Sequence, residues 1–280
     1  MSANIFRDTP IDSVRGYWDR RPCNLRHSPQ AVGTREYFDE VEARKYFVEP
    51  HIPRFAEFDR WRGKKVLEIG CGIGTDTINF ARAGAQVTAV DLSEKSQALA
   101  KQRAQVFGVQ DRIRFYAGNA EQLSTFVPVE PYDLVYSFGV IHHTPQPERV
   151  MEQLRPYVHP GSTVKVMVYH RHSWKVLWIL LTYGKGQFWR LPELVATYSE
   201  AETGCPVTYA YTPGEARELV ERCGARVTDS FVDHIFPYRI PDYVQYRYVK
   251  VWYFRWLPTP VFRSLEQRLG WHLCVTAQVP

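Results

Sequence analysis

The sequence lacks the cysteine spacings that mark disulfide-rich and zinc-binding proteins. It has only five cysteines in 280 residues, an odd number, and no CxxC pair. Neither a disulfide framework nor a structural zinc site is therefore expected. Long apolar runs are also missing: the longest covers residues 176–181, whereas a spanning helix needs about 20 apolar residues. We therefore expect a cytoplasmic protein without a transmembrane helix.

Targeting signals and strongly charged tracts are absent as well. Residues 1–13 contain no apolar segment of the kind that a signal peptide needs, so no leader is expected. The net charge is +5 without a block of like charges, and nucleic acid is not an expected partner. The basic excess lies in the two flanks of the chain. It fits either a solvated surface or an affinity for anionic substrates and membrane surfaces. No pattern indicates an oligomeric state.

The middle of the chain alternates short apolar runs with helical patterns. The runs are typical of strands buried on both faces and cover residues 65–69, 86–90, 112–116, 132–137 and 163–169. Helices are predicted between them over residues 76–82, 94–107 and 147–157. Two later runs, at residues 226–236 and 271–277, would complete the sheet. The pattern indicates an α/β, Rossmann-like fold with a seven-stranded, mostly parallel sheet and helices on both faces.

Three zones follow from this pattern. Residues 1–62 are expected to form an N-terminal helical cap, and residues 63–170 a ligand-binding core. Residues 171–280 are expected to supply C-terminal cap elements and the last two strands of the same sheet. Five side chains near the C-terminus are spaced as one helical face would be: Tyr243, Tyr246, Lys250, Tyr253 and Trp256.

A glycine-rich loop follows the first predicted strand. Gly70, Gly72 and Gly74 form a GxGxG pattern, whose backbone can turn sharply and approach a ligand closely. Asp91 ends the next strand, where a carboxylate can accept hydrogen bonds from ribose hydroxyls. Glu68 precedes the loop, and its charge would repel a phosphate. The loop therefore favours a nucleoside that carries an ammonium and a sulfonium over a dinucleotide.

Two segments resemble class I S-adenosylmethionine-dependent methyltransferases: VLEIGCGIGTDTINFARAGAQVTAVDLS and YDLVYSFGVIHHTPQPERVMEQLRPYVHPGSTVKVMVYH. They are most similar to the small-molecule branch typified by ubiquinone and menaquinone biosynthesis. The resemblance covers about residues 63–170 and implies S-adenosyl-L-methionine as cofactor. The residues that it assigns to cofactor binding are Glu68, Gly70, Cys71, Gly72, Gly74, Asp91, Leu92, Asn119, Ala120, Glu121 and Ser137.

The resemblance also implies where parts of the cofactor lie. The loop backbone at residues 70–72 would line the methionine moiety, Asp91 the ribose and Leu92 the adenine. Asn119 and Ala120 would lie at the adenine edge. Many relatives have Asp where this chain has Asn119, and the amide oxygen can accept the same hydrogen bond.

Two histidines follow the fourth predicted strand. His142 and His143 are candidates for a general base, with His142 preferred, and a structural role as a cap or loop brace is the alternative. A metal site built from these two with His170 and His172 is not expected, because no acidic ligand accompanies them. Candidate substrate-binding residues come from the caps and the end of the fifth strand: Tyr17, Trp18, Arg21, Tyr169, His170, Arg171, Trp174, Tyr246 and Tyr253.

The expected function is methyl transfer to a small molecule that is partly aromatic or apolar, with an anionic acceptor as one option. Residues 137–139 are not the Pro-Pro-aromatic loop of adenine methyltransferases, and no cysteine lies near the ends of the fourth and fifth strands. One alternative is a lipid or isoprenoid substrate at a membrane surface. Another is a non-catalytic cofactor-binding or scaffold protein. The sequence does not distinguish O-, N-, S- and C-methylation.

Overall fold

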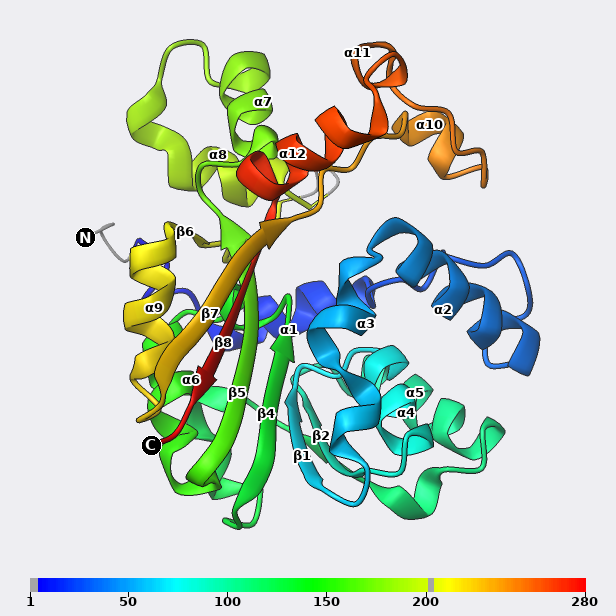
Figure 1. Cartoon of the computed structure of the whole chain (residues 1–280), viewed down its shortest axis with the longest axis vertical. Coiled ribbons are helices and arrows are strands. Elements are labelled where there is room, and N and C mark those ends of the chain that lie inside the picture. Colours follow the sequence, from blue (N-terminus) through cyan, green and yellow to red (C-terminus); the bar gives the residue numbers. More distant parts are fainter. Residues whose placement is uncertain (1–4, 201–203) are drawn as a thin grey trace.

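A computed structural model describes residues 5–200 and 204–280 (Figure 1). Its strands form one sheet in the order β3-β2-β1-β4-β5-β8-β7, and β6 pairs with β5. The strands are β1 (Lys65–Ile69), β2 (Gln86–Asp91), β3 (Ile113–Ala117), β4 (Tyr132–Phe138), β5 (Val158–His170), β6 (Ala210–Tyr211), β7 (Arg226–Asp233) and β8 (His272–Gln278). The predicted α/β class is confirmed.

The sheet is mostly parallel, as predicted, but has eight strands rather than seven. β6 is the additional strand, and its two residues are too few to give a periodic pattern. β8 runs antiparallel between β5 and β7. All other pairs are parallel. The carboxyl ends of the central strands therefore meet at one edge of the sheet, where ligands bind in such folds.

Two apolar layers enclose the sheet because successive side chains of a strand point to opposite faces. Leu67 and Val135 pack on one face with α6 (Pro147–Gln153) and α9 (Pro213–Glu221). Val66 packs on the other face with side chains from three helices. These are α3 (His51–Ala56), α4 (Thr75–Arg82) and α5 (Glu94–Val106). The helix predicted over residues 147–157 ends earlier, at Gln153, because Pro156 has no backbone N–H to continue it and lies in a separate 3-10 turn, η5 (Arg155–Tyr157).

The remaining helices form the caps at the carboxyl edge of the sheet (Figure 1). The N-terminal cap contains α1 (Ile11–Arg20), α2 (Arg35–Val48) and α3. The C-terminal cap contains α7 (Trp174–Tyr183), α8 (Leu191–Tyr198), α10 (Ile240–Tyr243), α11 (Trp252–Arg255) and α12 (Thr259–Leu269). Short 3-10 turns complete the chain: η1 (Phe58–Trp61), η2 (Gln110–Arg112), η3 (Ala120–Thr125), η4 (Ile141–His143) and η6 (Phe188–Arg190).

A buried arginine fixes the N-terminal cap to the core. Arg103 of α5 is fully buried and donates to the Thr75 hydroxyl at 2.7 Å. Its guanidinium also donates to the Phe38 carbonyl at 3.1 Å and to the Glu42 carboxylate at 2.9 Å, both in α2. Since a buried guanidinium without partners would be costly, these bonds hold α2 in one position against α4 and α5.

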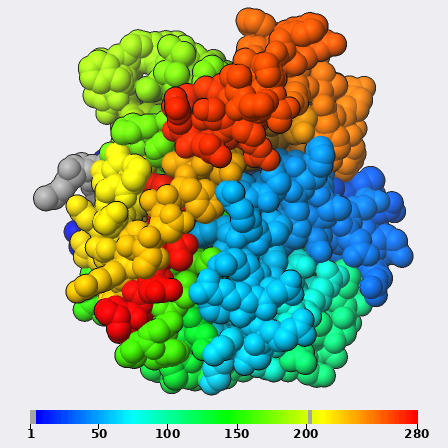
Figure 2. Space-filling model, viewed as in Figure 1, coloured from blue at the N-terminus to red at the C-terminus, as the bar shows by residue number. Residues whose placement is uncertain are grey.

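The two caps also meet each other, as the space-filling view shows (Figure 2). Arg44 of α2 lies over the Tyr243 ring at 4.0 Å and over the Tyr246 ring at 4.4 Å. The Tyr246 hydroxyl donates to the Arg26 carbonyl at 3.2 Å. Segments from opposite ends of the sequence thus stabilise one another over the carboxyl edge of the sheet.

The expectation of one helical face between residues 243 and 256 is wrong. The structure has two four-residue helices there, α10 and α11, and the chain between them folds back as a hairpin. Tyr238 and Lys250 form a β-bridge, and Tyr246 has a left-handed φ of 60°. Hairpin pairing therefore overrides the helical spacing of the aromatic side chains.

Candidate active site

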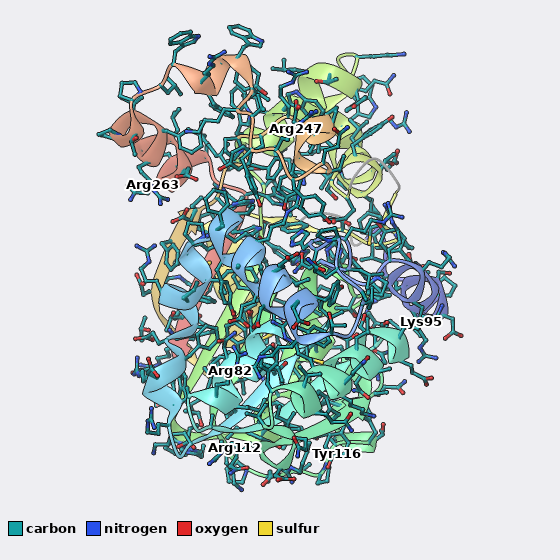
Figure 3. The ribbon with its side chains drawn as sticks, turned by 90° about the vertical axis from the view of Figure 1, so that its right-hand side faces the viewer. Arg82, Lys95, Arg112, Tyr116, Arg247 and Arg263 are labelled. Carbon is teal, nitrogen blue, oxygen red and sulfur yellow. The ribbon has the colours of Figure 1, made fainter. Side chains whose placement is uncertain are left out.

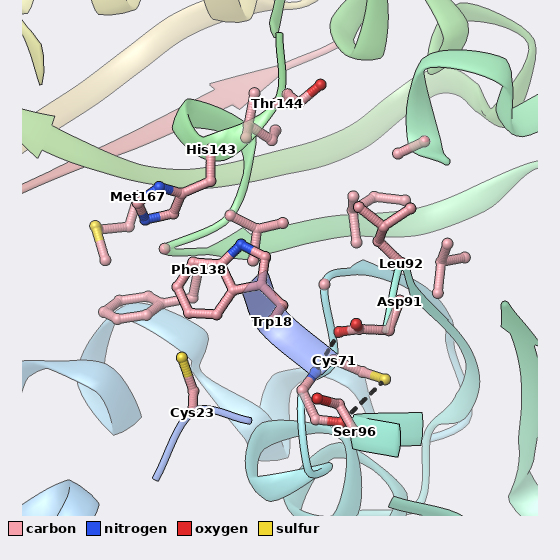
Figure 4. Close-up of a pocket in the computed structure, with 18 of the residues that line it drawn as sticks. Trp18, Cys23, Cys71, Asp91, Leu92, Ser96, Phe138, His143, Thr144 and Met167 are labelled. Atoms are coloured by element: carbon pink, nitrogen blue, oxygen red, sulfur yellow. Dashed lines mark hydrogen bonds between the residues drawn. The ribbon is translucent and has the colours of Figure 1, made fainter. Parts of the chain in front are cut away.

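A cavity of about 240 Å³ lies at the carboxyl ends of β1, β2, β4 and β5 (Figure 4). It extends on both sides of the junction between β1 and β4, where the strand order reverses. The glycine loop and Asp91 form one end. Side chains from β4, β5, β8 and the N-terminal cap form the other.

The glycine loop is held to Asp91 by direct hydrogen bonds. The Gly72 amide donates to one carboxylate oxygen of Asp91 at 2.7 Å, and the Ser93 amide donates to the other at 2.8 Å. Gly70, Gly72 and Gly74 all have positive φ, a backbone conformation that residues other than glycine rarely adopt. Burial raises the pKa of Asp91 to about 6, although the two amide bonds favour its ionised form.

A close approach fixes the loop against the start of η4. A side chain on Gly70 would place its Cβ 2.2 Å from Val140, the residue that precedes Ile141 and the two histidines. Ser137 supports the same contact, because its hydroxyl donates to the Ile69 carbonyl at 2.9 Å. Ser137 is fully buried and therefore braces β1 against β4 from outside the cavity lining.

Glu68 lies behind the glycine loop. The Thr77 hydroxyl of α4 donates to its carboxyl group at 2.5 Å, and the side chain lies outside the cavity lining. Burial, together with the nearby Asp76 carboxylate, raises the pKa of Glu68 to about 8. In the structure this acid braces the start of α4, and its contact with a ligand stays a prediction.

Some of the residues assigned to the adenine side line the cavity, and others hold the surrounding chain in place. Leu92, Asn119 and Ala120 line the cavity. The Asn119 side-chain oxygen accepts from the Glu121 amide at 3.0 Å, which caps η3. Glu121 in turn accepts from the Gln146 amide at 2.9 Å, so it joins this turn to the segment before α6.

The two histidines after β4 have different surroundings. His143 lines the cavity, and its Nδ1 lies 2.8 Å from the Val207 carbonyl. Because a carbonyl can only accept, Nδ1 carries the proton, and Nε2 is the acceptor nitrogen. His142 is fully buried outside the lining, and neither ring nitrogen has a hydrogen-bond partner among the described residues.

The pKa values of the pair separate as well. Burial and the neighbouring His143 hold the pKa of His142 well below its usual value, so its ring is neutral. Burial alone would also lower the pKa of His143. The Cys205 sulfur, the Glu200 carboxylate and the Val207 carbonyl outweigh burial and raise it. His143 is therefore the member of the pair that is equipped for proton exchange with the cavity.

Comparison with known proteins agrees with this geometry. Residues 66–161 match the model of a methyltransferase domain. A ubiquinone biosynthesis O-methyltransferase of Bordetella bronchiseptica is 34% identical over 119 residues, covering 42% of this chain and 48% of that protein. The chain spans about half or less of the length of the curated relatives that it matches. The predicted resemblance to methyltransferases is therefore confirmed for residues 66–161.

Solved structures share the overall fold of this chain. Magnesium protoporphyrin IX methyltransferase from Synechocystis PCC 6803, with bound SAH, superposes with a TM-score of 0.61 at 16% identity. That alignment covers 97% of this chain and all of the other. The cyclase SpnF superposes with a TM-score of 0.54 at 17% identity, covering 98% of this chain and 93% of the other. At these identities the likeness concerns the fold alone.

Two of the predicted substrate-binding residues line the cavity of the methyltransferase domain: Trp18 and Tyr169. The Trp18 ring meets the His143 ring edge to face at 5.1 Å. The Tyr169 ring lies 4.0 Å from that of Trp271, and its hydroxyl donates to Glu200 at 2.7 Å. Figure 4 shows Trp18 and His143 over the same opening as Asp91.

The other predicted substrate-binding residues lie outside the cavity lining. Arg171 instead joins β5 to the Ala210 carbonyl and to Glu215 of α9. His170 contacts the Gly270 carbonyl at 3.1 Å. Trp174 and Tyr253 lie within the C-terminal cap, with their rings 5.8 Å apart. The remaining members of this group are Tyr17, which is buried beside Trp18, exposed Arg21, and Tyr246, which packs on Arg44.

Several cavity residues were missed by the sequence analysis. They come from segments far apart in the chain: Cys23, Lys45, Glu49, Phe138, Met167 and His272. Cys23 belongs to the predicted N-terminal cap, and its thiol borders the cavity beside Phe138 (Figure 4). Desolvation by the cavity wall and nearby carboxylates raise the pKa of Cys23 to about 12, so it is a neutral thiol, although the residue is exposed. No local pattern could identify these residues, because the fold alone brings them together.

A glycine substitution tests the fit between the loop and Val140. Gly70→Ala should lower the free energy of unfolding by about 1 kcal/mol for the left-handed backbone, and by a further ~1–3 kcal/mol for overpacking. Gly63→Ala is the matched control, since Gly63 has a similar φ of 72° but nothing within 4 Å of an added Cβ. Urea denaturation of both variants measures the difference. Equal losses would contradict a tight contact at Val140.

Proposed function

We propose that this chain binds S-adenosylmethionine in the cavity and transfers its methyl group to a small molecule. The observation that carries the proposal is the position of Asp91 at the cavity edge, where its carboxylate accepts hydrogen bonds from the amides of Gly72 and Ser93. The match to a methyltransferase domain and the relatives named as O-methyltransferases support it.

The residues present fit this cofactor. Each Asp91 oxygen accepts one backbone amide and keeps capacity for a further donor, as two neighbouring ribose hydroxyls require. An added Cβ on Gly72 would meet nothing within 4 Å, so the loop leaves room for a ligand chain to pass. Leu92 and Ala120 supply apolar walls for a planar base. Within this arrangement the methionine end would lie toward Cys71 and Phe138.

The bound cofactor supplies an electrophilic methyl group, and the chain's task is to align an acceptor with it. The rate of methyl transfer gains most from orientation of the acceptor and from exclusion of water. Trp18 covers the opening from α1, and Tyr169 is held by Glu200 and Trp271. We assign His143 Nε2 as the group that takes the acceptor's proton, because it belongs to a cavity-lining ring fixed by Val207 and has no hydrogen-bond partner among the described residues.

Removal of the Asp91 carboxylate should weaken cofactor binding. Asp91→Ala is expected to cost ~1–3 kcal/mol of binding free energy, because ribose hydroxyls lose a charged partner. Isothermal titration calorimetry with S-adenosylmethionine measures the loss, and exposed Asp111→Ala is the control. With a pKa of about 6, the carboxylate becomes protonated as pH falls through 6. Wild-type affinity should fall over that window, and Asp91→Asn should remove this pH dependence. Unchanged affinity in both variants would refute the role of Asp91.

The two histidines should differ in kinetic effect. A general base contributes about 10²–10⁴-fold to rate, so His143→Gln should lower turnover by that range while cofactor affinity stays unchanged. His142→Gln should lower turnover less than about tenfold, because its ring does not reach the cavity. Product formation with phenolic and carboxylic acceptors measures both rates. Equal losses of turnover in the two variants, or no loss, would assign the pair a structural role. Cofactor binding without turnover of any acceptor would favour the non-catalytic alternative.

A second candidate is an acceptor held in a lipid surface. Within residues 5–200 and 204–280, no helix combines the length and apolarity that crossing a bilayer requires. The C-terminal cap nevertheless exposes at least 68% of each of five large apolar side chains: Leu181, Phe188, Trp189, Trp252 and Trp256. Basic side chains accompany them, and Figure 3 shows Arg247 at the end of the molecule opposite Arg112. Tryptophan beside arginine is typical of proteins that rest on anionic membranes.

Vesicle binding tests the second candidate. Trp252→Ser combined with Trp256→Ser should reduce cosedimentation with phosphatidylglycerol vesicles at least tenfold, because both indoles would insert at the lipid interface. Val129→Ser is the control, since Val129 is also exposed but precedes β4 at the other end of the sheet. Absence of binding by the wild type, or equal binding by the double variant, would leave a soluble acceptor as the proposal.

A further inference from the structure

A cluster of histidines with one carboxylate lies at the wall of the cavity. His51 begins α3, His234 follows β7 and His272 begins β8, and all three are buried. Glu49 directly follows α2 and lies beside them. Glu49 and His272 line the cavity on the side of Phe138 and Met167. The mechanism above uses none of these four side chains.

The spacing of the cluster is suited to one metal ion. A ligand atom from each of Glu49, His234 and His272 lies within 4.8 Å of the other two. The Glu49 carboxylate is 3.6 Å from His272 Nε2. Metal bonds of 2.0–2.1 Å in a tetrahedral site put ligand atoms roughly 3.3 Å apart, so small side-chain rotations would close the site.

His51 acts on the other nitrogen of His272. Its Nε2 lies 3.0 Å from His272 Nδ1, which leaves His272 Nε2 directed at Glu49. Histidine ligands commonly form a hydrogen bond through the nitrogen that does not bind the metal, and this bond fixes the ring. His51 therefore occupies the place of a supporting residue rather than a ligand.

The donor atoms of the cluster suit a transition-metal ion. Two imidazole nitrogens and a carboxylate oxygen are ligand types that Zn²⁺ takes in proteins. The positive charge of Lys45, on the same side, is paired with Asp76 at 2.8 Å.

We propose that Glu49, His234 and His272 bind one divalent transition-metal ion, of the kind that zinc and iron(II) exemplify. Two histidines and a carboxylate leave at least one coordination position open. Because Glu49 and His272 line the cavity, that position faces the acceptor side. The ion would there hold an oxygen atom of the acceptor and lower the pKa of a hydroxyl. This use of the ion depends on the proposed function, whereas the binding of the ion does not.

Metal binding by the full chain tests the inference directly. Protein treated with a chelator is titrated with Co²⁺, whose visible absorption reports nitrogen and oxygen coordination. One equivalent should bind, and Zn²⁺ should displace it. Glu49→Gln and His234→Gln should each weaken Co²⁺ binding at least 100-fold, and His51→Gln about 10–100-fold, as expected for a supporting residue. His159→Gln and His172→Gln, which change a half-buried and an exposed histidine outside the cluster, should leave binding unchanged.

Thermal unfolding and S-adenosylmethionine calorimetry on the same samples separate the outcomes. Glu49→Gln should keep the wild-type melting temperature without metal, because Glu49 is only partly buried. Absence of stoichiometric Co²⁺ binding by the wild type, or equal affinity in folded Glu49→Gln, would overturn the proposed site. Intact metal binding without S-adenosylmethionine binding would support the site while overturning the proposed function.

Discussion

The hydrogen bonds that join Asp91 to the glycine loop are the interaction on which the site depends. The amides of Gly72 and Ser93 reach the same carboxylate, so the end of β1, the end of β2 and the start of α5 are fixed together. Gly70 can then lie against Val140, which sets the position of η4 and of His143. A side chain at Gly70 or a shift of Asp91 would therefore disturb both ends of the cavity.

Local constraints made much of this predictable from sequence. Positive φ at Gly70, Gly72 and Gly74 is accessible mainly to glycine, so a GxGxG pattern after an apolar run indicates a sharp turn toward a ligand. All seven long strands were located, with ends within five residues of the prediction. For the central strands the reason is that strands buried on both faces are nearly continuous in apolar residues. Asp91 and the residues at 119–120 follow from the same order of elements.

Long-range contacts explain what could not be predicted. β8 inserts antiparallel between β5 and β7, which brings His272 beside Tyr169 and Asp233 and next to His51 and His234. The expectation of no metal site rested on the histidines after β4 and β5, and the proposed ligands come from other segments. The hairpin before α11 depends on a left-handed Tyr246, which spacing does not reveal. Cys23 reaches the cavity only because α1 and α2 fold over the sheet.

The identity of the ligand in the cavity is the central claim, and competitive calorimetry tests it most directly. The unmodified chain is titrated with S-adenosylmethionine, with S-adenosylhomocysteine and with NADH under the same conditions. The account predicts one equivalent of either sulfur nucleoside, each displacing the other, and no heat with NADH. Binding of NADH in competition with S-adenosylmethionine, or binding of no sulfur nucleoside at all, would contradict the assignment of this cavity to methyl transfer.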